Sequence, residues 1–439
     1  MRPVRQRMRS GGSAADLGAV AGSESSHDGV VASGRRASRP SRLQRVPLIG
    51  NDLGLGHNAR FIFLAMLFNE ASFGFYQNLF PLYVEGLGAS PGLVGLVIGL
   101  QGAVRLIFLA PAGMLADRIP LRRLIVGART ITIFGVLLYF LAQTWWHLIP
   151  AMLVMAAGNV CWPAVSKVVA DSTTDRTRTR AFTLVYTVGP SFALIISPAI
   201  GGFMAGWINL RSVFLAAAIC QVIAVILFAR IRPKEEAPHE RREPVGYRQA
   251  LGYGPVLVLC LLQFSLLFSL TIGFALAPNY LEDVKGLTIG TIGRFGSLIA
   301  VCSVLIGILV AKVKYFANPM NALFLAIALC PLAYLLLLNG GLTWHFALAY
   351  FLRGGYMVGW GLFYPAIGEV TPERLRTRAF ALTELLGGFG FALAPFVAGA
   401  LYSVDPALPI YVSLMLSIPM LAAIWLVRRY VAGHRIGTT

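Results

Sequence analysis

Residues 113–123 read Gly-Met-Leu-Ala-Asp-Arg-Ile-Pro-Leu-Arg-Arg, and they connect two apolar runs at 91–112 and 122–143. Each run is long enough to cross the ~30 Å hydrocarbon core of a bilayer, which takes ~20 helical residues. Helices satisfy their backbone hydrogen bonds internally, so a short charged turn between two such runs predicts a membrane-spanning helical hairpin.

The composition of the whole chain extends this prediction beyond one hairpin. Of the 439 residues, 57% are hydrophobic and 13% are charged, whereas soluble proteins are typically ~45–50% apolar and ~25% charged. So few charges could not cover a water-facing surface. We therefore exclude a string of soluble domains and expect an all-α, polytopic membrane protein.

Apolar runs of similar length recur to the C-terminal end. We expect twelve transmembrane helices, at 59–83, 91–112, 122–143, 146–169, 181–205, 211–231, 251–280, 287–311, 320–339, 344–368, 379–402 and 409–430. The expected organisation is a disordered basic tail (1–58), an N-terminal six-helix bundle (59–231), a linker (232–250), a C-terminal six-helix bundle (251–430) and a C-terminal tail (431–439). The first tail is either a genuine cytoplasmic extension or the product of a start codon assigned too early.

Basic residues gather in the loops on one side of the predicted bundle and account for a formal net charge of +18. Because these residues lie between apolar runs, membrane topology explains them better than a nucleic-acid partner does. Loops rich in Lys and Arg stay on the cytoplasmic side. We therefore expect both termini to be cytoplasmic and the protein to lie in the cell membrane.

The two halves repeat short motifs at matching places. Arg-Thr-Arg-Ala-Phe occurs at 178–182 and 376–380, Trp-Pro-Ala-Val at 162–165 matches Tyr-Pro-Ala-Ile at 364–367, and Pro-x-Tyr-x-Glu occurs at 81–85 and 278–282. Internal repeats are typical of transporters. A pseudo-symmetric repeat of six helices is therefore expected.

The turn at 113–123 resembles the signature loop of the major facilitator superfamily, Gly-x-Leu-Ala-Asp-Arg-x-Gly-Arg-Arg. The matching residues are Gly113, Leu115, Ala116, Asp117, Arg118 and Arg122. The resemblance covers about 59–430 and implies two six-helix bundles that carry a solute by alternating access. It also implies that Gly113, Asp117 and Arg118 latch the halves together at the cytoplasmic side. Leu121 replaces a family arginine, for which Arg122 is a candidate substitute.

A second resemblance concerns the direction of transport. Exporters of the superfamily carry Gly-Pro-x-x-Gly-Gly in their fifth span, and residues 198–202 keep Pro-x-x-Gly-Gly. Glycine and proline also make helices bend and pack closely, whatever the function. The motif therefore favours export without excluding import.

Ionisable residues inside spans are costly and are candidate functional groups. We single out Glu70, Arg105, Arg353 and Glu384. Glu70 and Arg105 lie at similar depths, so an ion pair between two helices is feasible. A paired Glu70 would stay ionised and structural, whereas an isolated carboxyl would favour its protonated form and could exchange a proton for substrate.

Polar and aromatic side chains follow two of these charges at helical spacing. Asn69 and Tyr76 share a face of the first span, with Gln77 on the adjacent stripe, and Arg353 is followed by Tyr356 and Trp360. Such faces could line a cavity for an organic molecule, although they are equally typical of helix packing.

Charges at the inner helix ends are candidate gate residues. Glu384 is near enough in sequence to pair with Arg374, Arg376 or Arg378. Lys167 and Glu369 occupy matching repeat positions, which suggests an ion pair between the halves that breaks on inward opening.

No phosphate-binding glycine loop, catalytic constellation, cofactor motif or metal-ligand spacing occurs in the sequence, so we expect neither an ATP-driven pump nor an enzyme. The predicted function is secondary active transport of a small organic solute, as a proton-coupled exporter. The alternatives are a proton-coupled importer of a sugar or organic acid and, more remotely, a membrane sensor or scaffold. The expected partners are the solute, protons and the lipid bilayer, and a monomer suffices for the fold.

Overall fold

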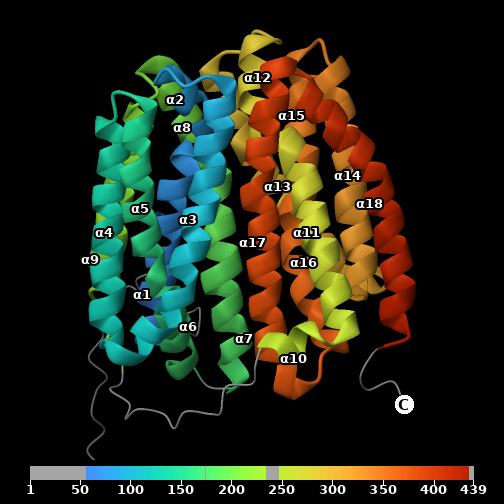
Figure 1. Ribbon diagram of the computed structural model, residues 1–439. Helices are drawn as coiled ribbons and strands as arrows, with labels where there is room; N and C mark the ends of the chain where they lie inside the picture. The colour runs from blue at the N-terminus through green and yellow to red at the C-terminus, as the bar shows by residue number, and fades with distance from the viewer. Residues whose placement is uncertain (1–55, 174, 234–246, 435–439) are drawn as a thin grey trace, which may run out of the picture. The chain divides into compact units, whose positions relative to one another are not determined.

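The computed structural model describes residues 56–434, apart from residue 174 and 234–246. Over these residues the chain is helical and contains no strand (Figure 1). The predicted all-α fold is therefore confirmed. The tail at 1–58 and the linker at 232–250 fall largely outside the described residues, and the end of that linker forms the short helix α10 (Tyr247–Leu251).

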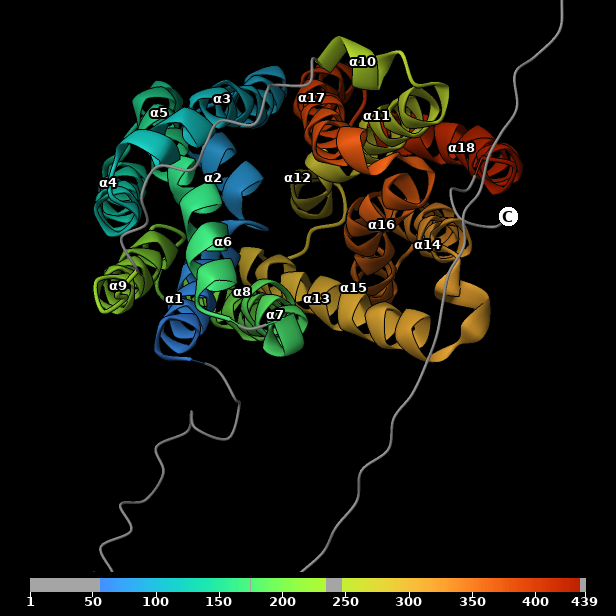
Figure 2. The same ribbon diagram turned by 90° about the horizontal axis from the view of Figure 1, so that it is seen from below.

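The helices form twelve consecutive segments that correspond to the twelve predicted spans. The N-terminal half contains α1 (His57–Tyr76) with α2 (Phe80–Gly86), α3 (Pro91–Arg118), α4 (Leu121–Leu141), α5 (Leu148–Gly158) with α6 (Trp162–Asp171), α7 (Asp175–Thr183) with α8 (Gly189–Trp207), and α9 (Ser212–Phe228). The C-terminal half contains α11 (Gly254–Ala275) with α12 (Ala277–Asp283), α13 (Ile289–Lys312), α14 (Pro319–Asn339), α15 (Thr343–Leu352) with α16 (Gly354–Val370), α17 (Glu373–Val404) and α18 (Leu408–Ala432). Figure 2 shows the two halves as two groups of helices.

Nine of the described segments are long and apolar enough to cross a membrane. The other three segments are α9, which is shorter, and the pairs α1–α2 and α15–α16. The interruption between α15 and α16 falls at Arg353, before Gly354 and Gly355. A Cβ atom on Gly354 would lie 2.5 Å from the Ile299 carbonyl oxygen, so the chain approaches α13 closely at this break.

Glycines let the two halves approach along two seams, by which we mean the helix pairs α3–α17 and α8–α13. In the first, a Cβ atom on Gly95 would lie 2.7 Å from the Cα atom of Gly399. In the second, a Cβ atom on Gly202 would lie 2.5 Å from the backbone nitrogen of Arg294. Such close backbone packing requires residues without side chains. The Pro-x-x-Gly-Gly element at 198–202 thus forms part of the contact between the halves.

The helix ends opposite the basic loops, here called the outer ends, also join the halves. The Asn78 side-chain amide donates to the Ile292 carbonyl oxygen at 2.6 Å. The Asn279 amide likewise donates to the carbonyl oxygen of Pro81, across the contact between α12 and α2. The two short helices, α2 and α12, are labelled near the top of Figure 1.

Candidate functional site

A buried arginine organises the interior of the N-terminal half. Arg129, on α4, is 2% exposed, and its Nη1 donates to Oδ1 of Asn69 at 2.9 Å. Its Nη2 donates to the Gly158 carbonyl oxygen and to Oδ1 of Asn159, at 3.2 Å for the latter. The guanidinium also lies 4.6 Å from the ring centroid of Trp162. A buried charge is stable only with such a set of acceptors and a polarisable ring.

The local fold of the fourth span supplies part of that set. Helix α5 ends at Gly158, and the 3-10 turn Asn159–Cys161 separates it from α6. This change of helix type leaves the Gly158 carbonyl oxygen available to accept from Arg129. A Cβ atom on Gly158 would lie 2.9 Å from the Ala128 carbonyl oxygen, so the close approach to α4 requires glycine there.

Asn69 connects Arg129 to Glu70, the predicted proton carrier. Its Oδ1 accepts from Arg129 and from Nε2 of Gln221, the latter at 3.1 Å. Its Nδ2 donates to Oε1 of Glu70 at 3.0 Å. Asn69 itself is 6% exposed, so it does not lie on an open face as predicted but inside this network. Glu70 is half-buried at the edge of the network and shares an exposed stripe of α1 with Phe73 and Gln77.

The ion pair between Glu70 and Arg105 is not formed in the structure. Arg105 is exposed on α3, and the described side chains give it no hydrogen bond to Glu70, which is bonded to Asn69. Both Arg129 and Arg105 act electrostatically on Glu70, and Arg129 is the stronger of the two. The buried cation linked to Glu70 is therefore not Arg105 but Arg129 on α4, through Asn69.

The predicted open position of Tyr76 is also corrected by the structure. Tyr76 is 2% exposed, and its ring packs against Tyr139 and Phe214, at centroid distances of 6.1 and 5.2 Å. These contacts place it in the core of the N-terminal half. By contrast, Gln77 is exposed, in line with the stripe predicted for it.

In the C-terminal half, Arg353 lies at the break between α15 and α16. Its guanidinium lies 4.7 Å from the Phe274 ring centroid and 5.6 Å from that of Tyr350. Its Nε and Nη1 are buried and make no hydrogen bond to the described residues. Tyr356 is buried close by, where its hydroxyl shares a 2.6 Å hydrogen bond with that of Thr271. Tyr356 is therefore a core residue and not, as predicted, part of an open face.

Glu384 pairs with aromatic donors instead of the predicted arginines. Nε1 of Trp360 donates to Oε1 of Glu384 at 3.3 Å, and the Tyr364 hydroxyl donates to the same oxygen. All three side chains are half-buried between α16 and α17. Arg374 lies about three helical turns before Glu384 on α17 and lines a pocket at the basic end of the helix.

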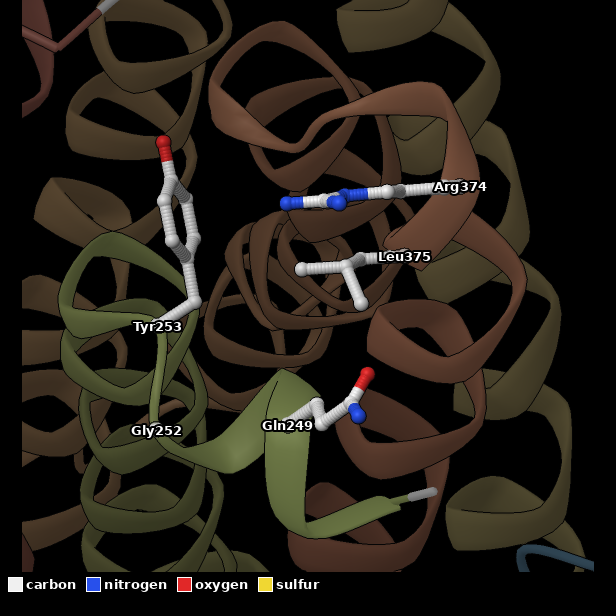
Figure 3. Close-up of a pocket in the computed structure, with 5 residues that line it drawn as sticks. All are labelled: Gln249, Gly252, Tyr253, Arg374 and Leu375. Atoms are coloured by element: carbon white, nitrogen blue, oxygen red, sulfur yellow. The ribbon is translucent and has the colours of Figure 1, made fainter. Parts of the chain in front are cut away.

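A pocket of about 450 Å³ lies at the basic end of the C-terminal half. It is lined by Gln249, Gly252, Tyr253, Arg374 and Leu375. Figure 3 shows Arg374 and Leu375 reaching from α17 toward the segment that connects α10 with α11. The pocket therefore marks where the end of the linker packs on α17, away from Glu70 and Glu384.

The remaining predicted residues lie at the basic ends. Helix α3 extends to Arg118 and so includes Gly113 and Asp117, whose side chains are outside the described set. Arg122 is exposed and its Nη2 donates to the Ala229 carbonyl oxygen at 2.6 Å, within the N-terminal half. Lys167 on α6 is exposed and Glu369 on α16 is half-buried, and the bridge between them stays a prediction.

Arg129 is the functional candidate that sequence reasoning missed. It lies inside the predicted span 122–143 and meets the criterion that selected Glu70 and Arg353. Its proximity to Arg122 and Arg123 made it look like part of the basic loop. The distance from Leu121, more than two helical turns, was the available signal.

Comparison with known proteins agrees with this architecture. The family model of the Major Facilitator Superfamily matches residues 62–368. The quinolone resistance protein NorA of Staphylococcus aureus is 24% identical over 388 residues, covering 80% of this chain and 94% of NorA. The multi-drug resistance efflux pump PmrA homolog of Lactococcus lactis is 23% identical, covering 77% of this chain and 86% of that protein.

Two further matches bear on the fold. The inner membrane transport protein YajR of Escherichia coli is 27% identical over 184 residues, and the match spans 41% of this chain and 40% of YajR. The crystal structure of the nucleoside transporter NupG superposes with a TM-score of 0.70 at 12% identity, covering 86% of this chain and 99% of NupG. Given the family match over most of the chain, the protein belongs to the major facilitator superfamily and is a multi-pass membrane transporter of small substrates.

Proposed function

We propose that this transporter is a proton-driven exporter of small organic molecules. The names of two relatives support export, since one is a quinolone resistance protein and the other a multi-drug resistance efflux pump homolog. The Pro-x-x-Gly-Gly element at 198–202 supports the same direction through its resemblance to exporters.

The proposal that transport is coupled to protons rests on the position of Glu70. It is an acidic residue of α1 that is both half-buried and joined, through Asn69, to a buried arginine. When Glu70 is ionised, the charge of Arg129 compensates it inside the bundle. When Glu70 takes up a proton, that compensation is lost and the charge balance of the N-terminal half changes by one unit. A group whose protonation changes the charge of a buried network is suited to link proton binding to conformation.

Substrate would bind beside this acid. Phe73 and Gln77 are exposed on the stripe that Glu70 shares, and they offer one ring and one amide. In the C-terminal half, Trp360 and Tyr364 already hydrogen-bond to Glu384 and are partly exposed. Aromatic faces with a few polar groups fit organic molecules better than inorganic ions.

Replacing Glu70 with glutamine tests the coupling. The variant keeps the hydrogen bond to Asn69 but cannot exchange a proton, so dye or antibiotic efflux driven by a pH gradient should fall to the empty-vector level. The measurement is accumulation of a panel of fluorescent dyes and antibiotics in cells, with and without a protonophore. Glu373→Gln, which alters an exposed carboxylate in the first turn of α17, is the control. A Glu70→Gln protein that still extrudes substrate when the pH gradient is the only driving force would exclude Glu70 as the proton carrier.

The latch proposed for Asp117 has its own test. Asp117→Asn should slow transport severalfold while substrate binding to purified protein stays within about twofold, because a weakened latch changes the conformational step and not the binding site. Asp171→Asn, at an exposed carboxylate on the basic end of α6, should leave turnover unchanged. Equal turnover of wild type and Asp117→Asn would remove Asp117 from the latch.

A further inference from the structure

The two copies of the Pro-x-Tyr-x-Glu repeat meet across the halves. Helix α2 carries the first copy at 81–85, and α12 carries the second at 278–282. The Asn279 amide on α12 donates to Oε2 of Glu85 and to the Pro81 carbonyl oxygen on α2. The contact that closes the outer ends is therefore made by the repeated motif itself.

Three carboxylates gather at this contact: Glu85, Glu282 and Asp283. The charge of Asp283 acts on Glu85, and the charges of Asp283 and Glu85 both act on Glu282. The Tyr402 hydroxyl on α17 donates to Oδ2 of Asp283 at 2.6 Å. Asn279 and Tyr402 thus supply neutral donors to two of the acids, but neutral groups do not cancel the repulsion between like charges.

The nearby cations are committed elsewhere. Nζ of Lys285 donates to the Leu338 and Gly340 carbonyl oxygens, at 2.7 and 3.3 Å. Arg294 donates to the Gly290 carbonyl oxygen and to Oγ1 of Thr291, at 3.2 and 3.0 Å. Arg211 acts electrostatically on Tyr83 of α2, but the described side chains give it no hydrogen bond to any of the three carboxylates.

The other titratable groups that face the contact add no positive charge. Asp405 and Tyr411 act on Tyr280, the tyrosine of the second motif copy. Within the described part of the chain, the three carboxylates are therefore offered no lysine or arginine as a bonded partner.

Asn279 contributes a second, independent observation. Its side chain is 1% exposed, yet its Oδ1 has no hydrogen-bond donor among the described residues, although a buried polar atom is normally paired. The same amide group is held against Glu85 through its Nδ2. Oδ1 of Asn279 therefore lacks a donor hydrogen, and a protonated carboxyl group beside it would provide one.

We propose that Glu85 and Glu282, beside the charge of Asp283, share a proton at the outer contact between α2 and α12, and that this proton holds the outer ends of the two halves together. Closing the outer ends brings the half-buried Glu85 and Glu282 close to the exposed Asp283, and a shared proton reduces the repulsion. In the open state each carboxylate would be surrounded by water.

The direction of the pH dependence follows from Glu85. Partial burial raises the pKa of its carboxyl, the Asn279 hydrogen bond lowers it, and the charge of Asp283 raises it, with a net increase over the ordinary value. A group whose pKa is higher in the closed than in the open state favours closure at low pH. Closure is lost as the pH rises through the raised pKa. One proton changes the ratio of closed to open molecules by at most tenfold per pH unit.

Spin labels at Ile208 and Leu342 can measure this ratio. Ile208 follows α8 in the N-terminal half and is 66% exposed, and Leu342 precedes α15 in the C-terminal half and is 59% exposed. The distance distribution between the labels, in purified full-length protein without substrate, should shift toward the longer distance as the pH rises from about 5 to about 8. The background should be Glu70→Gln, so that the intramembrane acid of the proposed function does not contribute.

Two variants and a control decide the outcome. Glu85→Gln/Glu282→Gln should remain closed over the whole pH range, since it imitates the protonated state. Asn279→Asp adds a fourth carboxylate of nearly the same shape and should move the opening transition to lower pH. Glu373→Gln, at the exposed carboxylate in the first turn of α17 at the basic end, should keep the wild-type response.

A distance distribution that does not change with pH in the Glu70→Gln background would overturn the proposal. So would a pH response that persists unchanged in both cluster variants. Neither result bears on export or on Glu70, because the measurement involves no transport.

Discussion

Replacing Arg129 with methionine is expected to lower the free energy of unfolding by about 3–5 kcal/mol and to leave little folded transporter in the membrane. The substitution removes the donor for Asn69, Asn159 and the Gly158 carbonyl oxygen, all of which lie inside the N-terminal half. Each buried acceptor that loses its partner costs about 1–3 kcal/mol, and Glu70 loses its compensating charge. Methionine replaces the apolar stem of the arginine side chain but not its guanidinium group, so the loss comes chiefly from the polar atoms that the guanidinium satisfied.

The measurement is the thermal stability of purified protein, together with the amount recovered from membranes. Arg123→Met is the matched control, because Arg123 is exposed on the same helix. Arg129→Lys should fall between the two, since one ammonium group keeps the charge but cannot reproduce the two-sided contact of a guanidinium. If Arg129→Met were as stable as Arg123→Met, the hydrogen bonds around Arg129 would not support the fold.

The overall fold could be predicted because it depends on the length of apolar runs and the placement of basic loops. The twelve predicted spans correspond to twelve helical segments, with boundaries that differ by a few residues. The glycines at 201 and 202 were recognised as close-packing residues, and the structure places Gly202 against α13. These are properties that a local stretch of sequence carries by itself.

The partners of the buried polar residues could not be predicted in this way. Helical spacing placed Tyr76 on one face of its helix but did not indicate that α4 and α9 would cover that face. The sequence predicts that Glu384 pairs with an arginine close to it in the chain. Its donors are instead Trp360 and Tyr364 on the preceding helix, α16. Which neighbour satisfies a polar group depends on helix rotation and on breaks such as the 3-10 turn at Asn159–Cys161, and neither follows from hydrophobic periodicity.

Introducing leucine at Gly202 is expected to reduce transport to a few per cent of the wild-type rate or less. A Cβ atom at this position would lie 2.5 Å from the Arg294 backbone nitrogen and 2.7 Å from the Gly290 carbonyl oxygen. These are main-chain atoms of α13, so the clash cannot be relieved by turning a flexible side chain. One extra methyl group in a packed contact typically costs 1–3 kcal/mol, and a leucine side chain adds three more carbon atoms.

The free-energy cost of a side chain at residue 202 applies only to the conformation in which the outer ends are closed. Gly202 is in the last two turns of α8 and faces the beginning of α13, near the outer ends that are joined in the structure. A side chain there disfavours the state with closed outer ends but not the state in which they separate. Since a shift of 1.4 kcal/mol changes a population ratio tenfold, even Gly202→Ala should displace the equilibrium by about one order of magnitude.

The expected signature is an outer distance that stays long at every pH, measured with the labels at Ile208 and Leu342. Gly307→Leu is the control, because Gly307 lies on α13 as well but a Cβ atom there would meet no atom within 4 Å. It should leave both transport and the distance distribution unchanged. If Gly202→Leu transports at the wild-type rate, the close approach of α8 and α13 is not needed in any state of the transport cycle.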